Sequence, residues 1–181
     1  MVPHGRRTRN MEVTLGPDGR LAWHGETVPC AVGRGGILRD KREGDGATPA
    51  GRFPFRRLLY RADRISRPMT GLPVERLAES DGWCDDPADP RYNRQVRLPY
   101  PARCERLWRE DPLYDVILII GHNDAPVVPG RGSAVFVHVA RSDLAPTEGC
   151  VALRPENLLA LAAALAPGDG LRIEESLRPA G

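Results

Sequence analysis

The hydrophobic positions of the chain fall into short runs separated by turn residues, a pattern typical of a protein built mainly from β-strands. Three such runs open the chain at residues 13–15, 21–23 and 28–32, with Gly-Pro-Asp-Gly and His-Gly-Glu between them. Turn residues at that spacing predict a β-meander, in which consecutive strands pair with each other. A further strand is expected from Arg52 to Tyr60.

The strongest core signals lie in the second half of the chain. Residues 116–120 read Val-Ile-Leu-Ile-Ile, and residues 134–139 read Ala-Val-Phe-Val-His-Val. Because these runs are short and rich in β-branched residues, they predict two central strands of one sheet. A last strand is expected at residues 171–174.

One segment has a helical rather than a strand period. After Pro155, a favourable first-turn residue, apolar side chains recur at helical spacing until Pro167-Gly168. The pattern predicts one amphipathic helix from Pro155 to Ala166, directly after the segment with the most informative chemistry.

Residues 62–112 give no clear period. Six prolines, at positions 68, 73, 87, 90, 99 and 101, interrupt any helical pattern, so a long irregular insertion is expected there. Loops of that length are often binding surfaces or lids. The length of 181 residues fits a single domain, 1–181, with residues 1–10 expected to form a flexible N-terminus.

Composition and charge exclude several classes of protein. The formal net charge is +2 without a focused basic run, so no nucleic-acid partner is expected. No stretch is apolar enough to cross a membrane, and residues 1–7 lack the apolar segment of a secretory signal. Cys30, Cys84 and Cys104 form no Cys-x-x-Cys pair and are expected to be single buried thiols, although pairing among them stays open.

The chemistry concentrates between residues 136 and 153. His138 ends a strand-like run, and Cys150 follows Gly149 after a short loop. A thiol attacks a carbonyl group as thiolate, and a nearby imidazole is a suitable base near neutral pH. The N–H groups of Gly149 and Cys150 are the expected oxyanion-binding donors, and the dipole of the helix from Pro155 would favour the thiolate if its N-terminus points toward Cys150.

Two separated segments carry a resemblance to a known family. His138, followed by Thr147-Glu148-Gly149-Cys150-Val151, resembles the histidine and the Ser/Thr-His-Gly-Cys-hydrophobic signature of the YkuD-type L,D-transpeptidases. Upstream, the run Gly46-Ala47-Thr48-Pro49-Ala50-Gly51-Arg52-Phe53 resembles the Thr-Pro-x-Gly-x-Phe turn of that family. The chain departs from the signature at Glu148, where a second histidine is common, and at Ala152, where arginine is usual, and its loop from His138 to Cys150 is shorter. The chain therefore resembles a divergent branch of this family.

The resemblance implies a fold, an activity and a mechanism. The fold is a YkuD-like β-sandwich or barrel of mixed sheets with one helix after the cysteine. Cys150 would attack a donor stem peptide of peptidoglycan, release a terminal D-amino acid and pass the acyl group to an acceptor amine, with His138 as the base. The product would be a 3-3 cross-link, or a 1-3 link with a different acceptor.

The resemblance also implies partners and a location. Donor and acceptor stem peptides are the expected substrates, carbapenem-type β-lactams are possible inhibitors, and no cofactor or metal is expected. The substrate places the protein in the periplasm or the cell-wall space, although this chain shows no export signal.

Several further residues are candidates for contacts with the substrate. Because Ala152 provides no guanidinium, Arg141 or Arg154 could bind a substrate carboxylate instead. Glu148 is a further substrate-binding candidate by its position in the signature. His122 either borders the cleft or belongs to a turn, and Thr147 either orients His138 or the substrate or provides turn chemistry.

Three alternative functions are also compatible with the sequence. With water as the acceptor, the protein would be an L,D-carboxypeptidase. A zinc peptidase could use His122, His138 and either Asp124 or Cys150 as ligands. A peptidoglycan-binding domain that has lost its activity would explain the departures from the signature.

Overall fold

The structure is a computed structural model that describes residues 9–176. The flexible N-terminus expected for residues 1–10 therefore falls almost entirely outside the described residues. In chain order the elements are β1 (Glu12–Leu15), β2 (Arg20–Trp23), β3 (Glu26–Pro29), β4 (Ile37–Leu38), β5 (Thr48–Pro49), β6 (Gly51–Tyr60), β7 (Val74–Arg76), β8 (Asp81–Cys84), β9 (Gln95–Arg97), β10 (Cys104–Arg106), a 3-10 helix (Pro112–Tyr114), β11 (Val116–Ile120), β12 (Phe136–Val139), β13 (Val151–Leu153), α1 (Pro155–Ala164) and β14 (Gly170–Ile173).

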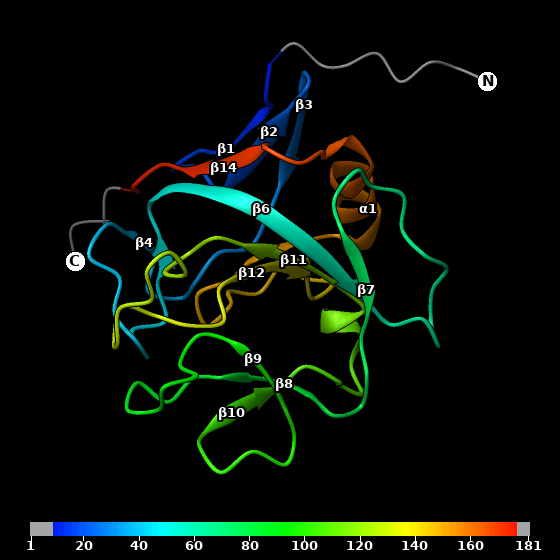
Figure 1. Ribbon diagram of the computed structural model, residues 1–181. Coiled ribbons are helices and arrows are strands. Elements are labelled where there is room, and N and C mark those ends of the chain that lie inside the picture. The colour runs from blue at the N-terminus through cyan, green and yellow to red at the C-terminus, as the bar shows by residue number, and fades with distance from the viewer. Residues whose placement is uncertain (1–8, 177–181) are drawn as a thin grey trace.

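One large mixed sheet forms the body of the protein (Figure 1). Its strand order is β13-β12-β11-β6-β14-β1-β2-β3, with β7 paired to β6 as a ninth strand. The two ends of this order meet, because Ala31, just beyond β3, exchanges two backbone hydrogen bonds of 2.9 Å with Ala152 of β13. The sheet is therefore nearly closed. The predicted mainly β fold of mixed sheets is confirmed, and so is the opening β-meander.

The predicted central strands are neighbours in this sheet. β11 and β12 pair in antiparallel orientation, and every residue of both strands is buried. Such strands read as continuous apolar runs because both of their faces are covered. The sequence therefore correctly predicted two neighbouring interior strands of one sheet.

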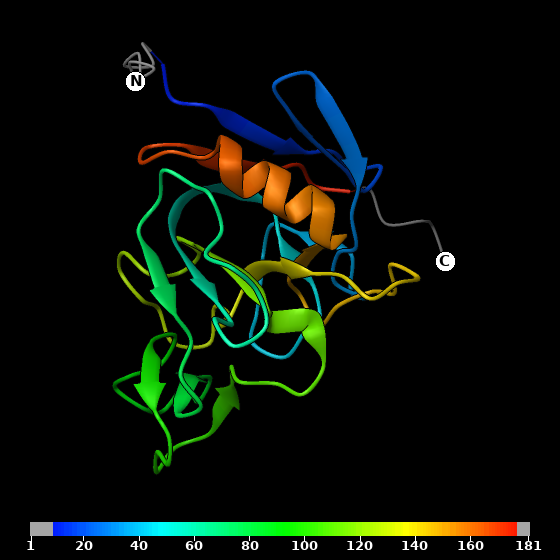
Figure 2. The same cartoon turned by 90° about the vertical axis from the view of Figure 1, so that its right-hand side faces the viewer.

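Helix α1 covers one end of the main core (Figure 2). Leu158, Leu161 and Ala162 are completely buried against the inner face of the curved sheet. The helix ends at Ala164, two residues before the expected end, because Leu165 takes an extended backbone conformation with ψ of 146°. Leu165 is still buried in the same core.

The segment 62–112 is more regular than expected, which corrects the prediction of an irregular insertion. It contributes β7 to the large sheet and forms a separate three-stranded antiparallel sheet of order β10-β8-β9. These strands are only three or four residues long. A run of that length shows no measurable period, and its pairing with distant segments decides that it is a strand.

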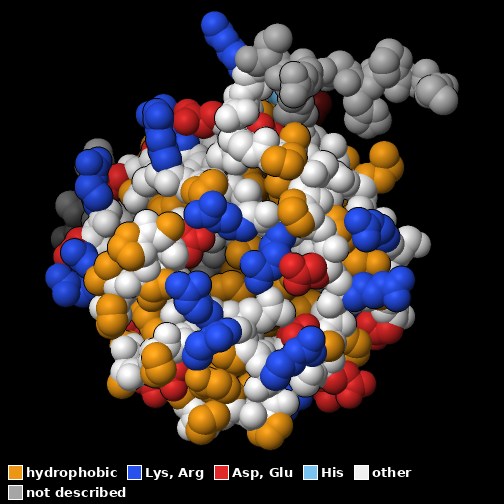
Figure 3. Space-filling view, viewed as in Figure 1, with side chains coloured by type: hydrophobic (Ala, Val, Ile, Leu, Met, Phe, Trp, Pro, Cys, Tyr) orange, Lys and Arg blue, Asp and Glu red, His pale blue; other side chains and the backbone are white. Residues whose placement is uncertain are grey.

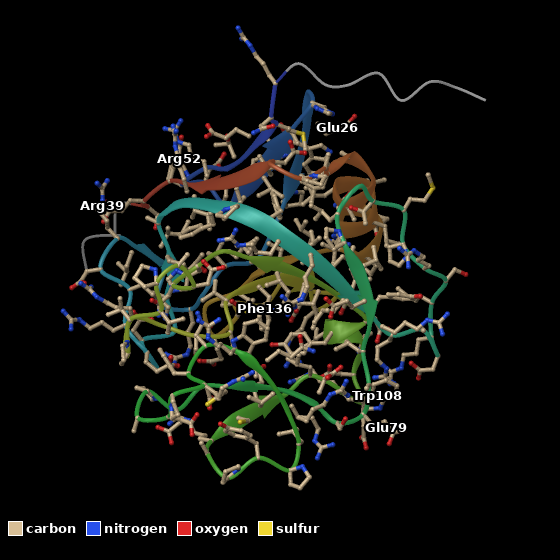
Figure 4. The ribbon with its side chains drawn as sticks, viewed as in Figure 1. Glu26, Arg39, Arg52, Glu79, Trp108 and Phe136 are labelled. Atoms are coloured by element: carbon tan, nitrogen blue, oxygen red, sulfur yellow. The ribbon has the colours of Figure 1, made fainter. Side chains whose placement is uncertain are left out.

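A second hydrophobic core fills the space between this small sheet and the outer face of the large one. Trp83 of β8 packs edge-to-face against Phe136 of β12, with ring centroids 5.0 Å apart. Phe136 lies between the two sheets in Figure 4. Leu107 and Tyr114 complete this core from the end of the insertion. The insertion thus covers one face of β11 and β12.

The surface carries both signs of charge. On the face shown in Figure 3, Lys and Arg side chains are interspersed with Asp and Glu side chains. Within residues 9–176, no helix is long and apolar enough to span a membrane.

Candidate active site

The register of β12 and β13 brings the two predicted catalytic residues onto one face. The strands are parallel, and His138 pairs with Ala152. Because side chains alternate along a strand, His138 and Phe136 share a face, and Cys150 and Ala152 share the same one. Val137, Val139, Val151 and Leu153 point to the opposite face and into the main core. His138 and Cys150 therefore both face the second core and the insertion.

Cys150 is held as a neutral thiol. Its Sγ accepts a hydrogen bond from the backbone N–H of Phe136 at 3.3 Å and donates one to the carbonyl oxygen of Ala134 at 3.2 Å. Burial raises the pKa of this thiol to about 12, and the negative charge of Glu105 acts in the same direction. The Phe136 N–H group and the positive charge of Lys41 lower the pKa by less. In the resting protein, the thiol proton is on sulfur and points to Ala134.

His138 is held as a neutral imidazole. Its Nδ1 lies 2.8 Å from the carbonyl oxygen of Val139, so Nδ1 is assigned the proton and Nε2 is left as the basic nitrogen. The ring of Tyr114 packs edge-on against the imidazole, with centroids 5.2 Å apart. Burial lowers the pKa of His138 to about 4, and the positive charge of Arg109 adds to the effect. A neutral ring can accept a proton from a thiol at neutral pH.

The loop before Cys150 is fixed by two threonine hydroxyl groups. Thr147 Oγ1 accepts from the N–H of Gly149 at 3.1 Å and donates to the carbonyl oxygen of Cys150 at 2.6 Å. Thr48 Oγ1 donates to the carbonyl oxygen of Gly149 at 2.9 Å and accepts from the N–H of Gly33 at 2.8 Å. The hydroxyl of Thr147 thus holds the turn, and none of its hydrogen bonds goes to His138.

Gly149 is required for the fit of this loop. Its φ of +139° is in the region that favours glycine, and a Cβ built there would lie 2.9 Å from the carbonyl oxygen of Ala47. The backbone of residue 47 thus occupies the space that a side chain at position 149 would need. The Thr-Pro turn and the cysteine loop need Gly149 in order to pack together.

The predicted oxyanion donors and the predicted effect of the helix dipole are only partly present in the structure. The N–H of Gly149 is engaged by Thr147, whereas the N–H of Cys150 has no acceptor among residues 9–176. Only the latter amide is free for an oxyanion. Helix α1 begins at Pro155, beyond β13, and packs into the main core on the opposite face of the sheet. Its dipole falls off within one turn and does not act on Cys150.

A cavity of about 520 Å³ opens beside the cysteine. Six of the predicted site residues line it, namely Cys150, His138, Gly149, Thr147, Arg141 and Glu148. Glu148 is 81% exposed and forms an ion pair of 2.9 Å with Arg34. The position where arginine is usual, Ala152, also lines the cavity.

Two predicted substrate-binding residues lie elsewhere. His122 lines a separate cavity on the β6 side and accepts or donates through Nε2 at 3.2 Å from the carbonyl oxygen of Arg131. Arg154 is exposed at the start of α1 and lines neither cavity. Neither residue therefore lines the cavity that contains the thiol.

The cavity contains further residues that the sequence analysis did not single out. They are Lys41, Glu43, Asp85, Glu105, Arg109 and Tyr114. Lys41 is the only lysine of the chain and is buried, with its Nζ donating to Asp45 and to the carbonyl oxygen of Arg42 at 2.8 Å. That Lys41 is the only lysine of the chain was the one sequence feature that could have pointed to it. Glu105 belongs to the segment 62–112, which has no readable pattern, and Tyr114 follows that segment in the short 3-10 helix, so no local signal pointed to either residue.

The ligands of the alternative zinc site are not brought together. His122 and Asp124 line the second cavity, whereas His138 and Cys150 line the first. No group of three or more His, Cys, Asp or Glu side chains in the described part of the chain is placed to hold a metal ion.

Comparison with solved structures finds L,D-transpeptidases at low identity. A Mycobacterium smegmatis L,D-transpeptidase is 13% identical, with a TM-score of 0.44, over 91% of this chain and 58% of that chain. The LD transpeptidase LdtMt1, in complex with imipenem, is 13% identical, with a TM-score of 0.41, over 91% and 58%. The helical cell shape determining protein Pgp2 from Campylobacter jejuni is 16% identical, with a TM-score of 0.44, over 93% and 49%.

This chain therefore spans between about half and three fifths of the length of these proteins. No curated protein sequence matches it. A family model described as the L,D-transpeptidase catalytic domain, YkuD, matches residues 6–173, which include both motifs and the whole nearly closed sheet. The chain belongs to the YkuD family of L,D-transpeptidase catalytic domains.

Proposed function

We propose that this protein is a peptidoglycan L,D-transpeptidase that works through an acyl-enzyme on Cys150. The observation that carries the proposal is the placement of Cys150 and His138 on one face of the parallel β12–β13 pair, in a single cavity of about 520 Å³. A thiol and a neutral imidazole that line one cavity of that size are suited to acyl transfer from a peptide.

The first half-reaction forms the thioester. When the donor peptide enters, the Cys150 thiol gives up its hydrogen bond to the carbonyl oxygen of Ala134, and its S–H proton passes to Nε2 of His138. The sulfur attacks the donor carbonyl, and the N–H of Cys150 stabilises the oxyanion, a contribution of about 3 kcal/mol for one donor. The imidazolium then returns its proton to the leaving D-amino acid. Burial of His138 makes the imidazolium unfavourable, which promotes this return.

The second half-reaction transfers the acyl group to an amine. The donor carbonyl is that of the L-centre of diaminopimelate in a tetrapeptide stem, as the family suggests. An acceptor amine gives a 3-3 cross-link, or a 1-3 link if the N-terminal amine of a stem peptide reacts. Attack by water would give L,D-carboxypeptidase activity.

Arg141 is the proposed carboxylate-binding residue. It lies two residues beyond the end of β12, lines the cavity and is exposed, and it has no ion-pair partner among residues 9–176. A guanidinium in that state can bind the carboxylate of a D-amino acid in bidentate fashion. It would replace the arginine that the family usually carries at the position of Ala152.

The substrate suggests the location. We propose that the protein acts in the periplasm or the cell-wall space, because polymerised peptidoglycan is found there. Fractionation of cells that express the full native gene tests this location, and recovery only from the cytoplasm would contradict it.

Product analysis tests the proposed function. The protein is incubated with purified disaccharide-tetrapeptide, and the products are identified by mass spectrometry with fragmentation of any dimer. Dimers that depend on Cys150 would establish transpeptidation, and their fragments would identify the acceptor amine. Tripeptide without dimer would establish the carboxypeptidase instead.

Two variants control the product analysis. Cys150→Ala is expected to form no product. Cys30→Ala removes another free thiol, which bonds to the carbonyl oxygen of Gly19 at 3.4 Å and does not line the cavity, and it is expected to retain activity. If Cys150→Ala bound the substrate as well as the unaltered protein and neither formed a product, the protein would be a peptidoglycan-binding domain.

A further inference from the structure

Three of the charged side chains that line the cavity beside Cys150 have no ion-pair partner among residues 9–176. Four of its charged side chains have an ion-pair partner within 4 Å, and the pairs are Lys41 with Asp45, Asp85 with Arg103, Arg109 with Asp111 and Glu148 with Arg34. The other three are Glu43, Glu105 and Arg141, which form no ion pair within residues 9–176. A charged ligand can therefore bind two carboxyl groups and one guanidinium without first breaking an ion pair within the protein.

Glu105 is the more available of the two carboxyl groups. Glu43 Oε2 is already bonded by the hydroxyl groups of Tyr92 and Ser133. Glu105 accepts one hydrogen bond, from Tyr114 Oη to Oε1 at 2.5 Å, and no other residue among 9–176 bonds to its carboxylate. A carboxylate has room for about four hydrogen bonds, so Glu105 retains most of its acceptor capacity.

The position of Glu105 directs it toward the reaction centre. It is opposite Trp83 in the β8–β10 pair, and Trp83 packs on Phe136 in the second core. Its partner Tyr114 packs edge-on against both His138 and Phe136, with centroids 5.2 and 6.0 Å apart. Glu105 thus lies on the insertion's side of the cavity, opposite the strands that carry the thiol and the imidazole.

The negative charge of Glu105 acts on the nucleophile. Its carboxylate is one of the groups that raise the pKa of Cys150. A negative charge beside the nucleophile opposes thiolate formation, so Glu105 does not help the first half-reaction. The raised pKa of the thiol is a cost to the first half-reaction. The same negative charge would favour the second half-reaction, in which the ligand is an amine.

An acyl-acceptor amine enters the site as a cation. A primary amine has a pKa near 10, so at neutral pH it is almost entirely an ammonium ion, which cannot attack a carbonyl group. The ammonium must be attracted to the site and must lose a proton before it reacts. A carboxylate with free acceptor capacity, next to the thioester, can do both.

We propose that Glu105 forms the binding subsite for the ammonium group of the acyl acceptor, on the insertion's side of the Cys150 thioester. The inference rests on the proposed function and deepens it by assigning the residue that selects an amine over water. After the D-amino acid of the donor has left, Arg141 would meet the carboxylate of the acceptor, so that Glu105 and Arg141 together match an α-amino acid end.

The transfer step balances with these groups. The bound ammonium gives one proton to the Glu105 carboxylate, and the amine nitrogen then attacks the thioester carbon. The new C–N bond forms, the C–S bond breaks, and its electron pair stays on sulfur. The second amine proton passes through His138 to the Cys150 thiolate. The products are the amide, a Cys150 thiol and a Glu105 carboxylic acid, which releases its proton to solvent.

The environment of Glu105 supports the role of proton acceptor. Burial raises the pKa of this carboxyl above its usual range, an effect that the hydrogen bond from Tyr114 and the charge of Arg109 partly oppose. A carboxylate with a raised pKa is a stronger base toward an ammonium than an exposed one.

A pair of thiol reagents tests the subsite directly. Cys150 is modified with 2-aminoethyl methanethiosulfonate, which carries a primary ammonium, and with the neutral methyl methanethiosulfonate. The rate constants are followed by peptide mass spectrometry, so that the other three cysteines do not interfere. The result is expressed as the rate constant of the cationic reagent divided by that of the neutral reagent. A change in the thiol pKa or in access to the cavity affects both rate constants equally and cancels in this ratio.

Three variants give the measurement its controls. Glu105→Gln keeps the shape and removes the charge, and Glu105→Asp keeps the charge. Glu79→Gln removes an exposed carboxylate of the same insertion, which is located at the periphery in Figure 4 and does not line the cavity. Thermal unfolding of each variant shows whether it is folded.

We expect the cationic-to-neutral ratio to fall about tenfold in Glu105→Gln, to be largely restored in Glu105→Asp and to stay unchanged in Glu79→Gln. An unchanged ratio in folded Glu105→Gln would overturn the proposed subsite. Both reagents report on the subsite whether or not the protein transfers acyl groups. Failure of this test therefore leaves the proposed function to the product analysis, and failure of the product analysis does not change the outcome here.

Discussion

Thr48 Oγ1 donates a hydrogen bond of 2.9 Å to the carbonyl oxygen of Gly149, across a sequence separation of 101 residues. This bond joins the Thr-Pro turn to the loop that carries Cys150. The same hydroxyl accepts from Gly33 N–H at 2.8 Å, and Thr48 is completely buried. The two separated sequence motifs are therefore one structural unit, in which the Thr-Pro motif fixes the loop that carries Cys150 through hydrogen bonds.

Replacement of Thr48 with Val should destabilise the protein by about 2–3 kcal/mol, because a buried donor and a buried acceptor lose their partner. Urea unfolding measures the change. Thr27→Val, at an exposed position of β3, should change the free energy of unfolding by less than about 0.5 kcal/mol. Equal effects at the two positions would show that the Thr48 bonds contribute little.

Replacement of Gly149 with Ala should abolish acyl-enzyme formation and destabilise the fold by roughly 2–4 kcal/mol. The φ of +139° is unfavourable for alanine, and the new Cβ would approach Ala47 O to 2.9 Å. Gly25→Ala is the matched control, because its φ is +83° but nothing lies within 4 Å of a new Cβ. It should cost about 1 kcal/mol and leave activity intact. Full activity of Gly149→Ala would contradict the close packing.

Alkylation of Cys150 by iodoacetamide should accelerate about tenfold per pH unit between pH 7 and 10, without a plateau. The reason is that burial raises the pKa of the resting thiol to about 12, so the thiolate fraction keeps rising through this range. Peptide mass spectrometry follows this residue separately from the other cysteines. A plateau below pH 9 would mean that the thiolate is stabilised in the resting protein.

The stability of the protein should decrease as the pH falls from about 6.5 toward 4. Burial lowers the pKa of His138 from 6.5 to about 4, so in this window the unfolded chain binds a proton that the folded protein does not. The contribution is fully present above the unfolded value and is on the order of 3 kcal/mol at most. The lowered pKa of His122 acts in the same direction.

Urea unfolding at a series of pH values tests this dependence. His138→Gln should show a clearly shallower decrease between pH 6.5 and 4 than the unaltered protein. His24→Gln, at an exposed turn, should show the same decrease as the unaltered protein. If His138→Gln and the unaltered protein lose stability in parallel, the imidazole is not held neutral in the fold.

Imipenem should acylate Cys150 and increase the intact mass of the protein by the mass of the drug, because its strained ring is an acyl donor that the thiol can open. Intact-mass measurement after incubation shows the adduct, which Cys30→Ala should retain and Cys150→Ala should lose. An unchanged mass would remove carbapenems from the proposed ligands.

The sequence by itself determined those features that depend on local pattern. β11 and β12 were predicted because continuous apolar runs mark strands covered on both faces. Helix α1 was predicted because its buried side chains recur every three or four residues after Pro155. His138 and Cys150 were singled out because their residue types and motif are local, and both line the cavity.

Tertiary structure alone decided which distant residues share the site. The register of β12 against β13 places His138 and Cys150 on one face, and a shift of one residue would separate them. His122 follows β11 but lines another cavity, and Glu105 lines the main one although the strand that carries it has only three residues. Strand pairing is non-local, so the partners of a short strand are fixed by long-range packing and not by its own sequence pattern.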